Sequence, residues 1–241
     1  MSVRSADGPG GDAPGPGQAD RLRVVFLDLD GCLVDSRTAI SRCLNVGLEA
    51  VGAAPRDERD LYRYIGPPLH ESFVTLLGHD GSSGEGTVAA RAARAVAAYR
   101  EAYVEVSLTD THAVAGIDDA LALLAAATTL AVVTSKPAEF AVPILERVGL
   151  AGWFTAVHAP TLTARAEDKA RTLARALDDV APGLEPGRTV MVGDRHHDID
   201  AGRACGTRTV GVTWGIGDAD ELAQADRLAA SPDELVAVVL V

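Results

Sequence analysis

The 241-residue chain has few cysteines and few aromatic residues. Its three cysteines, Cys32, Cys43 and Cys205, lie far apart and form no CxxC pair, which argues against a disulfide framework or a zinc site and favours a reducing, cytoplasmic location. Aromatic residues make up 4% of the chain, whereas hydrophobic residues of all kinds make up 47%. We therefore expect a core of small aliphatic side chains carried by helices and parallel strands, which is typical of α/β proteins.

Runs of basic residues and long apolar runs are also missing. The chain has 22 lysines and arginines against 34 aspartates and glutamates, a net charge of −12, so nucleic acid and anionic membranes are poor partners. Arg91 and Arg94, in an alanine-rich stretch, are predicted to lie on a solvated helix face. The longest apolar region, Ala120 to Val133, is interrupted by Thr128 and Thr129, which predicts a helix running into a strand rather than a membrane span.

The first 20 residues contain little that could be buried. The stretch SADGPGGDAPGPGQAD, Ser5 to Asp20, has no apolar periodicity, so burial cannot offset the entropy lost on ordering. We expect residues 1–20 to be a disordered leader, or the product of a start codon assigned too early. The basic-then-apolar order that marks a signal peptide is missing there.

What the sequence does contain is an alternation of short apolar runs with helical patterns. RVVFLD, LAVVTS, FTAVHAP, TVMVGD and RTVGVTWG are separated by stretches with a 3.6-residue spacing, which predicts repeated βαβ units and a parallel sheet. Between Ser36 and about Thr111, helical patterns follow one another with no convincing strand. We predict a core formed by residues 21–36 and 112–241, with a helical cap inserted at residues 37–111.

Polar residues follow three of the predicted strands at the carboxyl edge of the sheet, where open parallel sheets bind their ligands. They are Asp28 and Asp30, Thr134 and Ser135, and Asp194 with Asp198 one helical turn further on. Four carboxylates in one crevice repel one another unless a cation or a proton intervenes, and hard oxygen ligands of this kind suit Mg²⁺. Lys169, at the beginning of a predicted helix, is either solvated or reaches into this cluster to neutralise a bound phosphate.

These motifs resemble those of a known family. DLDGCLVDS, the strand end at Thr134, Lys169 and VGDRHHDIDAG resemble, in this order, the four sequence motifs of the haloacid dehalogenase-like hydrolase superfamily. RYIGPPLHESF, within the insert, is similar to the phosphoglycolate phosphatase-like branch. The resemblance extends from about Leu22 to the C-terminus. It implies an α/β fold with a Rossmann-like parallel-sheet core and an inserted α-helical cap, whose IGPP turn faces the active site.

The resemblance also implies the roles of the paired aspartates. Asp28 would be the nucleophile that attacks phosphorus to form an aspartyl-phosphate. Asp30 would protonate the leaving oxygen and then activate the water that releases phosphate. The spacing suits this division of work, because residues two apart on a strand point to the same side and can face one phosphoryl group.

The remaining motif residues would hold the metal and the phosphate. By the same resemblance, Mg²⁺ is bound by the Asp28 carboxylate, the Asp30 backbone carbonyl and Asp194, with Asp198 close by or acting through water. The phosphoryl oxygens would be held by Thr134 and the Ser135 backbone N–H, with Lys169 bridging Asp28 and the phosphate. Gly31 leaves room for the turn that follows Asp30. Ser135 stands where this branch usually has asparagine, but a contact through its backbone amide would be kept.

Some other chemistries are disfavoured. We do not expect His196 and His197 to bind metal, since adjacent side chains on a turn or helix point in different directions and imidazole is not a favoured Mg²⁺ ligand. The insert contains no lysine, which a phosphonatase would need in its cap to form a Schiff base. A haloacid dehalogenase, which uses no Mg²⁺, would not need both Asp30 and the acidic GDxxxD motif.

The sequence therefore predicts a cytoplasmic, Mg²⁺-dependent phosphomonoester hydrolase that acts on a small phosphorylated metabolite, with phosphoglycolate as the leading candidate. A 5′-nucleotidase, a sugar-phosphate phosphatase of a biosynthetic pathway and a phosphomutase similar to β-phosphoglucomutase are alternatives. A non-enzymatic phosphate-binding or partner protein is disfavoured because Asp28, Asp30 and Lys169 are all present. We expect a monomer or homodimer whose partner is a small-molecule phosphate ester, with no nucleic acid and no membrane.

Overall fold

The computed structural model describes residues 22–78, 87–162 and 168–240. The predicted leader and most of the glycine- and serine-rich segment that precedes residue 87 lie outside the described residues. The described residues contain a parallel sheet of six strands in the order β5-β4-β1-β6-β7-β8. Its strands are β1 (Val24–Leu27), β4 (Thr129–Val133), β5 (Ala156–His158), β6 (Thr189–Gly193), β7 (Arg208–Val212) and β8 (Arg227–Ala229).

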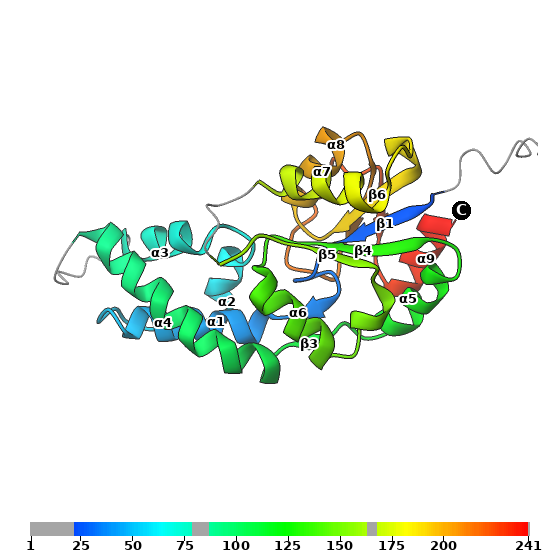
Figure 1. Ribbon diagram of the computed structural model, residues 1–241. Coiled ribbons are helices and arrows are strands. Elements are labelled where there is room, and N and C mark those ends of the chain that lie inside the picture. The colour runs from blue at the N-terminus through cyan, green and yellow to red at the C-terminus, as the bar shows by residue number, and fades with distance from the viewer. Residues whose placement is uncertain (1–21, 79–86, 163–167, 241) are drawn as a thin grey trace, which may run out of the picture.

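Helices cover both faces of this sheet (Figure 1). One face carries α5 (Ile117–Ala125), α6 (Ala138–Arg147) and α9 (Pro232–Leu240), and the other carries α7 (Lys169–Val180) and α8 (His196–Ala204). The alternation of side chains along a strand explains how β1 serves both layers: Val25 and Leu27 belong to the larger apolar cluster, whereas Val24 and Phe26 belong to the cluster under α7 and α8. The apolar run is buried throughout.

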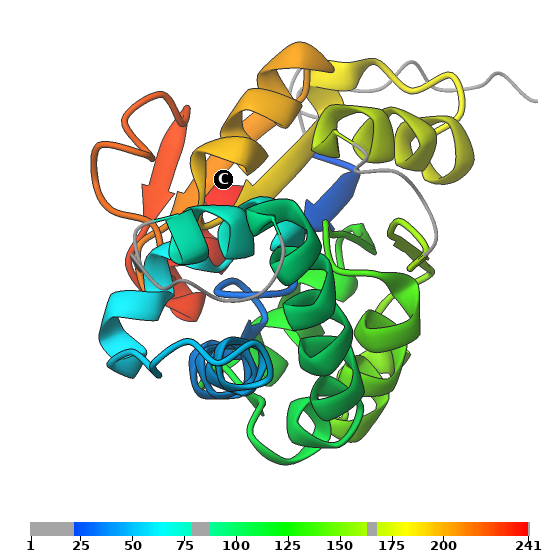
Figure 2. The same ribbon diagram turned by 90° about the vertical axis from the view of Figure 1, so that its left-hand side faces the viewer.

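A second layer of helices, which we call the cap, lies beyond the carboxyl ends of the strands (Figures 1 and 2). The cap consists of α1 (Arg37–Glu49), α2 (Glu58–Leu61), the 3-10 helix η1 (Tyr62–Tyr64), α3 (Leu69–Gly78) and α4 (Val88–Thr109). Two further 3-10 helices, η2 (Ala151–Trp153) and η3 (Pro186–Arg188), belong to the connections of the core. The prediction of a Rossmann-like α/β core with an inserted helical cap is confirmed.

The chain enters and leaves the cap through a small ladder that the sequence did not predict. Strand β2 (Val34–Asp35) pairs antiparallel with β3 (His112–Ala113), so that Val34 lies opposite Ala113 and Asp35 opposite His112. The Val114 N–H also donates to the carbonyl of Leu33 at 3.0 Å. Both ends of the cap are therefore fixed at one point beside β1.

One prediction about the cap is wrong. Arg94 is exposed, as expected, but the side chain of Arg91 is 2% exposed and donates to the carbonyl of Val51 at 3.3 Å. The cause is packing: α4 lies against α1 and α3 along a face that also buries Ala92 and Ala95. The small side chains of Ala92 and Ala95 leave space for the aliphatic part of the Arg91 side chain. Among the described helices, none is long and apolar enough to cross a membrane.

Candidate active site

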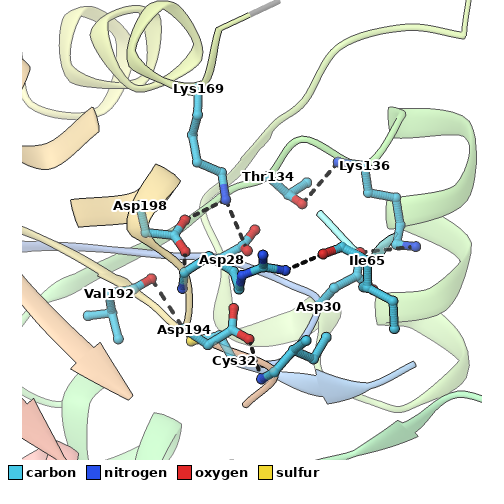
Figure 3. Close-up of polar contacts among 12 residues, drawn as sticks. Asp28, Asp30, Cys32, Ile65, Thr134, Lys136, Lys169, Val192, Asp194 and Asp198 are labelled. Atoms are coloured by element: carbon cyan, nitrogen blue, oxygen red, sulfur yellow. Dashed lines mark hydrogen bonds and ion pairs between the residues drawn. The ribbon is translucent and has the colours of Figure 1, made fainter. Parts of the chain in front are cut away.

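The site lies where the strand order reverses. From β1 the sheet extends through β4 to β5 on one side, and the chain then crosses to β6 on the other side of β1. Such a switch point opens a crevice at the carboxyl ends of the strands. Asp28 follows β1, Thr134 follows β4 and Asp194 follows β6, so the topology alone brings these three strand ends together (Figure 3).

Asp28 and Asp30 occupy different environments although they are two residues apart. The Asp28 N–H continues the sheet by donating to the carbonyl of Val192 at 2.9 Å, and its side chain is buried. Asp30 Oδ1 accepts a hydrogen bond from Ser36 Oγ at 2.6 Å. The two carboxylates therefore have different surroundings: Asp28 lies in the buried acidic cluster, whereas Asp30 lies outside it and is held by Ser36.

Gly31 makes the turn that follows Asp30 possible. Its φ of +78° is a conformation that residues with a side chain rarely adopt. A Cβ at this position would lie 2.6 Å from Cγ of Asp194, well inside van der Waals contact. The structure therefore places Gly31 where the backbone passes close to the carboxylate of Asp194.

Three buried carboxylates form a cluster that could hold a metal ion. Oxygen atoms of Asp28, Asp194 and Asp198 lie within 4.8 Å of one another. Among the described residues, Oδ1 of Asp28 and Oδ1 of Asp194 are buried without a hydrogen-bond partner. Buried polar atoms normally have partners, and a divalent cation would supply one for both. The residues present therefore fit an ion bound by oxygen ligands.

Burial and the charges of neighbouring acids work against the ionised forms of Asp28 and Asp194. Burial raises the pKa of Asp28 to about 6, with Asp198 and Asp30 adding to the effect and Lys169 opposing it. Burial likewise raises the pKa of Asp194 to about 7, with Asp198 and Asp28 as the next causes. A cation in the cluster would offset this cost, because it favours the ionised carboxylates.

Asp198 is less available to a metal than Asp194. Its Oδ1 accepts a hydrogen bond from Lys169 Nζ at 2.5 Å, and its Oδ2 accepts one from the backbone N–H of Arg195 at 3.1 Å. Asp194 uses only Oδ2, which accepts from the N–H of Ile216 at 2.7 Å. The Asp30 carboxylate is outside the cluster, so Asp30 could contribute only its backbone carbonyl, as the resemblance implies.

Lys169 reaches into the cluster, as the second of the two sequence interpretations expected. Asp168 is the N-cap of α7 and accepts from the N–H of Ala170, which leaves Lys169 as the first helical residue. Its Nζ lies 2.9 Å from Oδ2 of Asp28 and 2.5 Å from Oδ1 of Asp198. Burial disfavours the ammonium, but the carboxylates of Asp198 and Asp28 outweigh this and raise the pKa of Lys169 above its usual value.

The end of β4 supplies Thr134 and Ser135 to the same cavity. Thr134 is buried, its N–H donates to the carbonyl of His158 at 3.0 Å, and its Oγ1 accepts from the N–H of Lys136 at 3.2 Å. Ser135 is exposed and lies at the edge of the cavity. The structure thus brings together all the site residues that the sequence predicted.

Lys136 is a site residue that the sequence interpretation missed. Its Nζ lies 3.1 Å from Oδ2 of Asp30 and donates to the hydroxyl of Tyr103 at 2.6 Å. A signal was available: Lys136 and Lys169 are the only lysines in the chain, and both lie in this site. A residue type that is so rare in the sequence and stands three residues after the end of a motif strand could have been singled out.

Arg195, which follows Asp194 and is the N-cap of α8, joins the core to the cap. Its Nη1 donates to the carbonyl of Ile65, in the IGPP turn, and its Nε donates to Glu221 at 2.7 Å. Glu221 also accepts from His196 Nδ1 at 2.8 Å. The expectation that His196 and His197 point apart is wrong, since their ring centroids lie 3.8 Å from each other. Neither belongs to the metal-compatible cluster of the described residues.

A cavity of about 600 Å³ separates the cap from these residues. Its core side includes Asp28, Asp30 and Lys169, and its cap side includes Tyr64, His70 and Val96 of α4. The acidic cluster and Lys169 therefore line one side of a cleft whose opposite wall comes from the cap. A substrate held there would meet the carboxylates with one end and the cap with the other.

Comparison with known proteins gives the family. A family model described as haloacid dehalogenase-like hydrolase matches residues 24–212, and the chain belongs to this family. It is 34% identical over 203 residues to a 5′-nucleotidase of Pseudomonas aeruginosa, which covers 84% of this chain and 87% of that protein. It is 30% identical over 214 residues to phosphoglycolate phosphatase 1 of the same species, which covers 86% of this chain and 75% of that protein.

Two further similarities extend this result. The chain is 37% identical over 211 residues to the tyrosine-protein kinase PtkA of Mycobacterium tuberculosis, which covers 86% of this chain and 67% of that protein. A haloacid dehalogenase-like family hydrolase of Streptococcus pneumoniae matches with a TM-score of 0.80 and 26% identity, covering 90% of this chain and 98% of that one. The resemblance to the superfamily and to its phosphoglycolate phosphatase-like branch is confirmed.

Proposed function

We propose that this protein is a Mg²⁺-dependent phosphomonoester hydrolase that works through an aspartyl-phosphate on Asp28. The observation that supports it most directly is the buried cluster of Asp28, Asp194 and Asp198 around Lys169, which has two carboxylate oxygens without partners and opens into a cavity under the cap. We also propose that residues 37–111 form the cap and that residues 21–36 and 112–241 form the core.

The metal would be Mg²⁺, held by the Asp28 carboxylate, the Asp30 backbone carbonyl and Asp194, with Asp198 close by. Bound there, it would neutralise phosphate charge and orient the phosphoryl group. Asp198 would act mainly through its hydrogen bonds, which fix Lys169 and the beginning of α8. All four carboxylates that the sequence singled out thus keep a function in the proposal.

The reaction would use two displacements at phosphorus. In the first, a carboxylate oxygen of Asp28 attacks, the bond from phosphorus to the ester oxygen breaks, and Asp30 gives its proton to that oxygen. In the second, Asp30 takes a proton from water, the water oxygen attacks phosphorus, and the bond to Asp28 breaks. Phosphate leaves, and both aspartates return to their first state.

Three residues would hold the phosphoryl group during these steps. Thr134 and the backbone N–H of Ser135 would donate to its oxygens, and Lys169 would offset its charge while keeping Asp28 oriented. The position of Lys169 supports this task, because its Nζ already bridges two acids at the bottom of the cavity. The cap would exclude water from the site and contact the leaving group.

Phosphoglycolate remains our leading substrate candidate, because the chain is similar to the phosphoglycolate phosphatase-like branch of the superfamily. One observation favours a nucleoside monophosphate as the second candidate: the cavity of about 600 Å³ is far larger than the glycolate part of phosphoglycolate requires. The similarity to a protein named 5′-nucleotidase points the same way. A sugar phosphate would also fit. We place the enzyme in the cytoplasm, as a monomer or homodimer without nucleic-acid or membrane partners.

The test is phosphate release from phosphoglycolate, nucleoside monophosphates and sugar phosphates, each with Mg²⁺ or with EDTA. We expect release that requires Mg²⁺ and falls more than about 1,000-fold in Asp28→Asn. Asp200→Asn, an exposed change on α8, is the matched control and should retain activity. No release from any compound by folded wild-type protein would overturn the proposal in favour of a phosphomutase or a binding role. Because the chain is similar to a protein named tyrosine-protein kinase PtkA, ATP should be tested as well. That assay should distinguish release of phosphate into solution from transfer of phosphate to a protein tyrosine.

A further inference from the structure

Lys136 has no task in the reaction as described, although its position is unusual for a lysine. It follows Ser135 at the end of β4, and its side chain is only 6% exposed. A buried ammonium is costly unless it is paired and hydrogen-bonded. Lys136 meets this condition with one partner from the core, Asp30, and one from the cap, Tyr103 (Figure 3 shows the first).

On the core side, Lys136 completes the support of Asp30. Oδ1 of Asp30 accepts from Ser36 Oγ at 2.6 Å, and Oδ2 lies 3.1 Å from Lys136 Nζ. Two donors on opposite oxygens define the plane in which a carboxyl group lies. Ser36 is itself fully buried and immediately precedes α1. The orientation of Asp30 therefore depends on Lys136 for one of its two supports.

On the cap side, Lys136 is held by an aromatic group. Its Nζ donates to the hydroxyl of Tyr103 at 2.6 Å and lies 4.5 Å from the centroid of the ring. Tyr103, on α4, is 1% exposed, stacks on Tyr99 at 5.1 Å and meets the edge of Phe140 at 5.1 Å. This packing fixes the phenol, so the position of Lys136 follows the position of α4 relative to the core.

We propose that Lys136 is a positioning residue that holds Asp30 in the orientation from which it delivers a proton to the leaving oxygen, and that its bond to Tyr103 makes this support depend on the cap being in place. The inference rests on the proposed hydrolase function. It links cap position to the acid step: when α4 moves away, Lys136 loses one of its two anchors, and Asp30 is held less firmly. A substrate that holds the cap against the core would thereby also fix the orientation of Asp30.

The proposal predicts an effect that depends on the leaving group. The p-nitrophenolate ion leaves without a proton, whereas an alkoxide needs one, so only alkyl phosphates require a well-placed acid. Lys136→Met should lower kcat for the alkyl ester that the wild type hydrolyses best by about 100-fold, with KM nearly unchanged. The same variant should lower kcat for p-nitrophenyl phosphate by less than about fivefold. Lys136→Arg, which keeps a cation, should recover part of the loss.

Tyr103→Phe tests the link to the cap, since it removes the hydroxyl and keeps the ring. We expect about a threefold to tenfold loss with the alkyl ester, the size of one hydrogen bond, and little change with p-nitrophenyl phosphate. Tyr62→Phe is the matched control, because Tyr62 lies in the cap against Arg37 and outside the cavity lining. It should leave both substrates unchanged.

The outcomes separate this inference from the function on which it rests. Equal losses with both substrates in Lys136→Met would show a merely structural role and overturn the inference, as would no loss at all. If a thermal melt shows that Lys136→Met is not folded, Tyr103→Phe provides the test. The quantity compared is again the loss in kcat for the alkyl ester relative to the loss for p-nitrophenyl phosphate. Wild-type protein without Asp28-dependent phosphate release would overturn the proposed function itself, and this inference with it.

Discussion

Gly31 is a residue of the site that tolerates little change. Two separate constraints act there: the left-handed φ of +78°, and the 2.6 Å that would separate a Cβ from Cγ of Asp194. The first constraint is general to tight turns, and the second arises from the close approach of Asp194. Gly52 has a similar φ of +73°, but a Cβ added there would meet nothing within 4 Å, so the two glycines can be used to separate the constraints.

We expect Gly52→Ala to lower stability by about 1–2 kcal/mol, the cost of a side chain in the left-handed region. Gly31→Ala should cost more and should also lower phosphate release at least about tenfold, since Asp194 must move. Thermal melts and kcat for both variants provide the measurement. Similar melting temperatures and full activity in both variants would show that Asp194 can shift without consequence.

At the scale of elements, the segment between β7 and β8 supports the beginning of α8. The Ile216 N–H holds Asp194, and Glu221 binds both Arg195 and His196. Through Arg195, the same segment reaches the carbonyl of Ile65 in the cap. Partial burial disfavours the Glu221 carboxylate, but the hydrogen bonds from Arg195 and His196 outweigh this effect and lower its pKa to about 2.

This shift predicts how the stabilisation by Glu221 depends on pH. A carboxyl group whose pKa is lower in the folded state stabilises that state fully above its ordinary pKa of 4.5, and the contribution is lost as pH falls from 4.5 towards 2. Glu221→Gln should therefore lower the melting temperature at pH 6 by about 2–4 °C, and by less at pH 3. Glu146→Gln, an exposed change on α6, is the control. A difference that does not shrink at low pH would contradict the prediction.

At the scale of the whole molecule, the acidic cluster makes folding and metal binding depend on each other. The buried carboxylates of Asp28, Asp194 and Asp198 are brought together only when β1, β6 and α8 are in place. A ligand that binds only the folded form raises stability by mass action. The unfolded chain, in which Asp28 is far along the sequence from Asp194 and Asp198, offers no comparable site.

Mg²⁺ should accordingly raise the melting temperature. At a concentration 100 times its dissociation constant, the gain is about 2.7 kcal/mol, or about 5–10 °C for a chain of this length. Asp194→Asn should abolish most of the shift, whereas Asp200→Asn should keep it. Differential scanning fluorimetry with a Mg²⁺ titration makes the measurement without any substrate, and equal shifts in the two variants would place the ion elsewhere.

The long elements and the motif residues could be predicted because each leaves its own local pattern. An apolar run such as Val24 to Leu27, buried on both faces, marks a strand, and an acid at its end marks a site. The ladder of β2 and β3 was missed since two-residue strands have no periodicity. Lys136 could have been singled out as one of only two lysines in the chain, but its contact with Tyr103 of the cap could not be predicted, because no local pattern records how two layers dock.

The pairing of β2 with β3 has a consequence for how such a protein can be altered. Asp35 and His112 face each other at the end of an antiparallel ladder, and two residues in a tight turn are enough to join strands in this arrangement. A hairpin from Asp35 to His112 would shorten the connection between β1 and β4 by removing the cap together with Ser36, and would leave the other connections of the parallel sheet as they are. The cap is thus joined to the core by one pair of neighbouring chain segments, but its apolar side chains pack in the same buried cluster as those of the core, so a chain that lost the cap at this place would expose part of that cluster.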